Sequence, residues 1–147
     1  MLSPNIPLRT AYNTVLSTIT YQGAPVPVYW SQLPTDIAPG IYIIFGSIRN
    51  NDAGNKTSPV TSTSVTVSVY TNFMKYNDGE AVESVANEVL NRLYKNQKFN
   101  ISLPNSTFQI TNTTLESDAT NDFSQDQQNV YIDRVMVFNH RIFQNPS

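Results

Sequence analysis

The sequence predicts an α+β fold in which two helices pack on one face of a mainly four-stranded antiparallel sheet. Two segments carry apolar residues at helical spacing, one segment alternates between apolar and polar residues, and three others are rich in β-branched and aromatic residues. These elements follow one another in the order helix, strand, strand, helix, strand, strand. With 147 residues and no internal repeat, the chain is expected to form one domain over residues 1–147.

The first helix is predicted from Pro7 to Ile19. Proline suits the first turn of a helix, where its missing N–H group costs nothing. Gly23 can adopt the left-handed conformation that ends a helix. The apolar residues of this segment form one stripe: Leu8, Tyr12, Val15, Leu16 and Ile19.

An irregular arm follows, over residues 24–40. Its four prolines exclude a central strand, although the alternation of Val26, Val28 and Trp30 allows a short edge strand. Trp30, the single tryptophan, either covers the rim of the core or anchors a neighbouring subunit, since tryptophan is enriched at interface hot spots.

Two strands come next. The run Ile41–Phe45 is apolar at every position, so both of its faces are expected to be covered. The polar run Asn50–Lys56 is predicted to be a hairpin loop. The segment Thr61–Thr71 alternates valine with threonine, serine and tyrosine, which is typical of a strand packed on one side.

Asn77 or Asp78 can cap the N-terminus of the second helix. This helix is predicted to follow these caps and to end around Asn96, and its clearest part is Glu80–Leu93. Glu88 and Arg92 are four residues apart and can form a weak ion pair. The apolar face consists of Val82, Val85, Ala86, Val89, Leu90 and Leu93.

The last two strands are predicted at Thr107–Ser117 and Asn129–Phe143, with the polar loop Asp118–Gln128 between them. The acidic residues of that loop do not have the spacing of an EF-hand, although a weak calcium site there is an alternative to a solvated loop. His140, the single histidine, is interpreted as a half-exposed strand residue, with a catalytic role as the alternative.

The composition excludes several classes of function. The chain has no cysteine, which removes thiol catalysis and thiolate metal sites. No phosphate-binding, nucleophile-elbow or zinc-protease motif is present, so we expect no enzymatic activity, no cofactor and no metal. A net charge of -2 is unfavourable for binding free nucleic acid. No apolar run is long enough to span a membrane, and the N-terminus does not look like a secretion signal.

Charged residues make up 14% of the chain, well below the usual share of about 25%. Asn, Thr, Ser and Gln take their place. This composition suits a surface that neighbouring subunits cover, because buried contact surfaces are depleted in charge. Compositional drift towards asparagine codons explains it equally well.

The order of these elements resembles that of the tail-terminator, or tail-completion, proteins of tailed bacteriophages. The resemblance covers nearly the whole chain: the short first helix, a proline-rich arm, a buried strand, a polar loop, a valine-rich strand, a long helix and two closing strands. The segments that carry it are Val26–Pro34, Pro39–Phe45, Val65–Thr71, Glu80–Leu93 and Phe108–Leu115. The low charge content departs from the family, whose members often carry more charged residues.

The resemblance implies a structural virion protein in the tail or neck, assembled in the cytoplasm of the host bacterium. It implies a homo-oligomeric ring, a hexamer or alternatively a dodecamer, whose partners are the tail-tube protein and the head connector or portal. DNA would pass through the channel without specific binding. A neck or connector ring of a short-tailed phage is an alternative, and a small monomeric binding module is a second.

A closed ring needs heterologous contacts, in which one patch binds a different patch on the next copy. The polar loops and the tryptophan are the candidates for contacts with a subunit or partner. We therefore predict interface residues at Trp30, Asn50, Asn51, Asp52, Asn55, Lys56, Asp118, Asp122 and Asp126.

Overall fold

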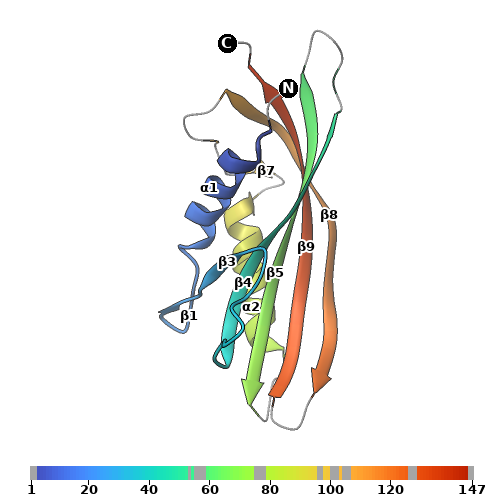
Figure 1. The fold of residues 1–147 in the computed structure, drawn as a ribbon. Helices are drawn as coiled ribbons and strands as arrows, with labels where there is room; N and C mark the ends of the chain where they lie inside the picture. Colours follow the sequence, from blue (N-terminus) through green and yellow to red (C-terminus); the bar gives the residue numbers. More distant parts are fainter. Residues whose placement is uncertain are drawn as a thin grey trace.

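The computed structural model describes residues 3–52, 54, 59–74, 79–95, 98–99, 103, 107–125 and 129–145, with only the backbone described for residues 74, 95, 98–99, 122–125 and 129–130. Its main feature is a five-stranded sheet in the order β3-β4-β5-β9-β8 (Figure 1). Two short two-stranded ladders, β1-β2 and β6-β7, lie outside it. The strands are β1 Thr20–Tyr21, β2 Ala24–Pro25, β3 Val28–Trp30, β4 Gly40–Asp52, β5 Val60–Met74, β6 Tyr94–Lys95, β7 Lys98–Phe99, β8 Phe108–Gln125 and β9 Asn129–Gln144.

The predicted α+β class is confirmed, but the sheet has a fifth strand, and that strand is parallel. The four long strands pair antiparallel, whereas β3 runs parallel to β4, with Val28 opposite Ile43 and Trp30 opposite Phe45. The prolines on both sides restrict β3 to a short edge strand. The chain then returns along residues 31–39 to the start of β4, so the two strands point the same way.

Both helices lie on one face of the sheet (Figure 1). Helix α1 spans Asn5–Leu16, so it begins and ends earlier than predicted, and Pro7 still falls within its first turn. Helix α2 spans Glu80–Leu93, so it carries the predicted apolar stripe but ends about three residues before the predicted end near Asn96. Its N-cap is Gly79, with a φ of 83°; the predicted caps at positions 77 and 78 lie outside the described residues.

The core lies between the helices and the inner face of the sheet. Val65, Val67 and Val69 are fully buried there, which confirms the predicted one-sided packing of β5. Serine and threonine alternate with them on the outer face and are half-buried. The helices contribute buried side chains to the same core: Leu8, Ala11, Tyr12 and Leu16 from α1, and Val82, Val85, Ala86, Val89 and Leu93 from α2.

The strand β4 is covered on its outer face only in part. Tyr42 is buried on this face: its ring lies against Tyr29, and its hydroxyl donates to the carbonyl of Ala38 in the returning segment, at 2.5 Å. Ile44, on the same face, stays half-buried. The expected cover on both faces is therefore complete at Tyr42 and incomplete at Ile44.

Both predicted polar loops were placed too early in the chain, because strands extend into their first residues. Asn50, Asn51 and Asp52 belong to β4 and pair with residues 61–63 of β5. The predicted loop from Asp118 begins as strand, since β8 continues to Gln125 and pairs with β9. Backbone hydrogen bonds to a long neighbouring strand keep these polar segments extended. The pairing of β8 with β9 is irregular, with three register shifts of the kind that β-bulges produce.

A buried polar cluster ties α1 to the sheet. His140 is fully buried rather than half-exposed, because it points inward from β9 into the core. Its Nε2 atom lies 2.5 Å from the hydroxyl of Tyr12 in α1, and its Nδ1 atom lies 2.8 Å from the hydroxyl of Thr113 in β8. The burial lowers the pKa of His140 to about 3, so the imidazole is neutral at physiological pH.

Acid should weaken this fold through His140. Between about pH 6.5 and 3 the unfolded chain binds a proton that the folded chain does not, so the free energy of unfolding falls as the pH is lowered. The variant His140→Gln lacks this titration. We compare the variant with the unchanged chain between about pH 6.5 and 5, where the acidic side chains titrate little. In this range the free energy of unfolding of the unchanged chain should fall more steeply as the pH is lowered, by up to about 1.4 kcal/mol per pH unit.

Urea unfolding at several pH values measures this dependence. Thr113→Val is the control, because it removes a partner of the imidazole but keeps the titrating ring; it should be less stable and keep the pH dependence. Equal slopes for His140→Gln and the unchanged chain would show that His140 does not titrate as its burial implies.

Candidate functional site

A surface groove lies between α1 and the edge strand β3. Ile6 borders it and is 78% exposed, although it is a large apolar side chain. The guanidinium of Arg9 lies 4.8 Å from the ring centre of Trp30, at a distance typical of a cation–π contact. Trp30 in turn meets Phe45 edge to face, with ring centres 5.0 Å apart, and Tyr29 lines the same groove. We call this surface the α1 groove.

Two residues predicted for an interface lie at this groove or beside it. Trp30 is half-buried and packs on the rim of the core, while part of its side chain lines the groove. Asn50 donates from its side-chain amide to the Oδ1 atom of Asn5, next to Ile6, at 2.7 Å. Its own Oδ1 accepts from the hydroxyl of Thr63, so Asn50 joins the end of β4 to the start of α1.

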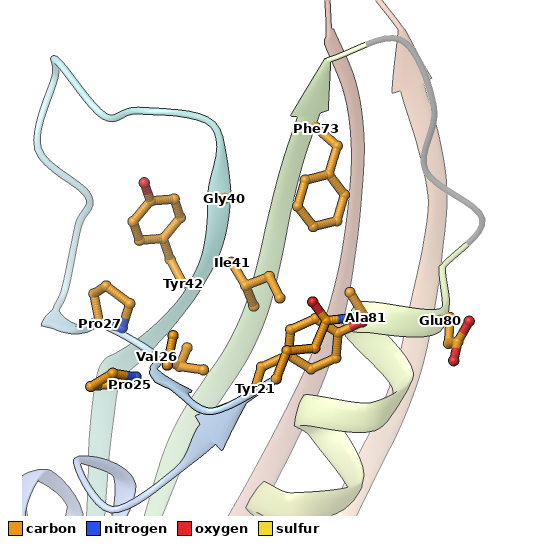
Figure 2. A pocket seen from close by; sticks show the side chains of 12 residues that line it. Tyr21, Pro25, Val26, Pro27, Gly40, Ile41, Tyr42, Phe73, Glu80 and Ala81 are labelled. Carbon is orange, nitrogen blue, oxygen red and sulfur yellow. Dashed lines mark hydrogen bonds between the residues drawn. The ribbon is translucent and has the colours of Figure 1, made fainter.

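A second hollow, of about 580 Å³, lies between the β1–β2 ladder, the start of β4, the end of β5 and the first turn of α2. Figure 2 shows the ring of Tyr21 beside Ala81, with Phe73, Ile41 and the prolines around the same space. We call it the proline pocket. Its lining residues include Tyr21, Ala24, Pro25, Val26, Pro27, Ile41, Tyr42, Phe73, Glu80 and Ala81.

One charged residue, Glu80, stands at the rim of the proline pocket. It is the first residue of α2 and is exposed, and Figure 2 shows its carboxylate pointing away from Tyr21 and Ile41. On the opposite side, burial and the neighbouring Tyr29 raise the pKa of Tyr42, so this phenol stays neutral. The side chains that point into the pocket are therefore uncharged.

The sequence did not reveal this pocket, because its walls come from segments that are far apart in the chain. The spacing of Pro25 and Pro27 near Tyr21 was the available local signal. It indicated an irregular arm but not what the arm would cover.

Asp118 has a structural role that the loop interpretation missed. It lies on β8 and binds the guanidinium of Arg134 through two bonds, each 2.7 Å long. The same guanidinium donates to Glu83 of α2 at 2.6 Å, and Thr120 donates to the other Glu83 oxygen at 2.6 Å. The hydrogen bond with Asp118 is the main reason why the pKa of Arg134 is raised. Arg134, on β9, thus links α2 to β8 and β9 through these contacts.

The other predicted interface residues that the structure describes lie apart from one another, on β4 and on β8. Asn51 and Asp52 are exposed at the end of β4, where Asp52 accepts from the backbone N–H of Gly54 at 3.1 Å. Asp122 lies on β8, where only the backbone is described. The predicted residues Asn55, Lys56 and Asp126 lie outside the described residues.

The predicted pair of Glu88 and Arg92 is present, at 3.6 Å on the exposed side of α2. In the described part of the chain, no three acidic or histidine side chains come close enough to hold a metal ion. None of the described helices has the length and apolar character needed to cross a membrane.

Replacing Arg134 should destabilise the protein more than replacing Arg92. Arg134→Met leaves Asp118 and Glu83 without their shared cation, and we expect a loss of about 2 kcal/mol in the free energy of unfolding, since solvent partly screens both acids. Arg134→Lys should recover less than half of this loss, because an ammonium cannot bind a carboxylate in the two-pronged way.

Urea unfolding measures these changes. The matched control is Arg92→Met, which removes an exposed pair and should cost at most about 0.5 kcal/mol. Similar losses for the two methionine variants would mean that the contacts of Arg134 are no stronger than ordinary surface ion pairs.

No protein-family model matches the sequence, and a search of curated proteins finds no match. Among solved structures, a chain from the virion of a native gene transfer agent particle has a similar fold. The match covers 95% of this chain and 90% of that chain. The two are 18% identical in sequence, and the TM-score is 0.59. A second solved chain is 14% identical over 95% of this chain and 96% of its own, with a TM-score of 0.50. At these identities the likeness establishes a shared fold.

Proposed function

We propose that this chain is a structural protein of a phage-type virion that forms a ring at the head–tail junction. The ring would terminate or complete the tail and join it to the head connector. The observation that carries the proposal is the fold shared with a gene transfer agent virion chain over almost the full length of both chains. The order of elements in the sequence, which resembles that of tail terminators, supports it independently of that comparison.

The described side chains fit a structural role better than a catalytic one. His140 lies in the core with both ring nitrogens close to hydroxyl groups, where a substrate does not reach. Asp118 and Glu83 are engaged by Arg134. The exposed features are instead the α1 groove and the proline pocket, which are surfaces suited to another protein.

A ring of the neck or connector is the alternative within the same class. The shared fold supports both types of ring equally, because a fold does not fix a function. The copy number separates them: six copies favour the terminator, and twelve favour the connector.

One observation favours a different class, a small monomeric binding module. The proline pocket has the volume and the apolar lining that are usual for small-molecule or peptide sites. Such a module would work as a single copy, so its oligomeric state distinguishes it from a ring protein.

The oligomeric state is the first test. We expect light scattering after size exclusion to give a mass near six times that of one chain, and negative-stain images to show annular particles. If the isolated chain is a monomer, the measurement is repeated with the tail-tube protein as assembly partner. A chain that stays monomeric in both experiments would contradict the ring.

A further inference from the structure

We propose that the outer face of the sheet, the face opposite both helices, forms a two-fold contact between two copies of this chain (Figure 1). In this contact Arg141 of each copy binds Asp133 of the other. The contact is separate from the proposed ring, because a two-fold contact joins two copies and then stops, whereas the contacts of a ring continue from copy to copy.

Strand β9 turns its side chains alternately to the two faces of the sheet. Arg134 points to the helices, where it binds Glu83 of α2, and His140 is buried in the core. Asp133 and Arg141 therefore point to the outer face, because neighbouring side chains of a strand lie on opposite sides. The register of β9 with β5 is unbroken, so the alternation holds between these two residues.

Opposite charges stand at the two ends of this face. Asp133 is half-buried and Arg141 is exposed, and eight residues separate them, which is about 27 Å along an extended strand. Among the described residues, neither has an ion-pair partner within its own chain. The outward positions between them on β9, and those opposite on β5, are uncharged: Val135, Val137, Asn139, Ser62, Ser64, Thr66, Ser68 and Tyr70.

This placement of charges makes the face complementary to itself. Val137 is midway between Asp133 and Arg141. When a second copy lies face to face with its β9 antiparallel to the first, residue 137 meets itself and each arginine lies level with the aspartate of the other copy. Both charge pairs then form at once by symmetry. An unrelated partner would need matching charges at both places, so a second copy is the occupant that the face itself specifies.

The middle of the face suits close packing. Val135 and Val137 are half-buried, as is Ile44 on the same side of β4. The free face of an antiparallel sheet is usually polar, so apolar side chains at its centre indicate a surface that is covered. Their neighbours on β5 are serine and threonine, which are small enough for a second sheet to approach to the usual spacing of about 10 Å.

The acidic end of the face is built for an arginine. Tyr70 lies directly opposite Asp133 in the register, and its ring stacks with that of Tyr131, with ring centres 6.1 Å apart. A guanidinium can bind a carboxylate and lie on a tyrosine ring at the same time, whereas an ammonium does so less well. Arg141→Lys should therefore weaken the association, although it keeps the charge.

Charge exchange tests the pairing. Arg141→Glu and Asp133→Arg should each weaken the association about a hundredfold at low salt, which is tenfold at each of the two symmetric charge pairs. An equimolar mixture of the two variants should associate again, and so should the double variant, because opposite charges then meet at both places. Arg92→Glu is the matched control, since it makes the same change at an exposed position on α2, and it should associate normally.

The midpoint has a test of its own. Val137→Lys brings two ammonium groups together, because residue 137 of each copy meets itself, and it should weaken the association as strongly as the charge exchanges. Val137→Thr has nearly the same shape and no charge, so it should keep most of the association. Circular dichroism and thermal melting check that each variant is folded.

Sedimentation equilibrium over a range of concentrations measures the association. The average mass of the unchanged chain should rise with concentration to at least twice its starting value, whether it starts from a single chain or from a ring. No rise, or an equal rise for folded Arg141→Glu and Asp133→Arg, would show that the outer face is not a two-fold contact. The starting mass tests the ring and the rise tests this contact, so either can fail alone.

Discussion

The structure depends on one constraint: only one face of the sheet is packed against helices. Val65, Val67 and Val69 are buried on that face, and the side chains between them on β5 point the other way. The apolar stripes of α1 and α2 therefore have a single place to pack, and the return of the chain along residues 31–39 gives partial cover to the opposite face at Tyr42. Both hollows border the helix layer, because α1 forms one side of the α1 groove and the first turn of α2 forms one side of the proline pocket.

Polar contacts fix how the helices sit on this apolar layer. Burial of apolar area is non-directional, so it favours close packing without selecting one position of a helix along the sheet. Tyr12 meets His140 within the core, which sets the position of α1, and Arg134 binds across to Glu83, which sets that of α2. Buried polar groups are costly when unpaired, so a shift of either helix would be penalised. The α1 groove and the first turn of α2 at the proline pocket are positioned by these contacts.

Several of the charged side chains of this weakly charged chain form ion pairs within the subunit. Arg134 and the acids it binds are used within the subunit, and Glu88 pairs with Arg92 along α2.

The sequence by itself determined the α+β class, the apolar face of α2 and the one-sided burial of β5, and it allowed the edge strand at Val28–Trp30, because helical and strand periodicity reflect burial that is local in the chain. Tertiary structure decided the rest. The polar ends of β4 and β8 became strands because neighbouring strands bind their backbones. His140 and Asp118 found partners far away in sequence, and the walls of the proline pocket come from four separate segments. Such features depend on distances between residues that no local pattern encodes, and only the folded chain brings those residues together.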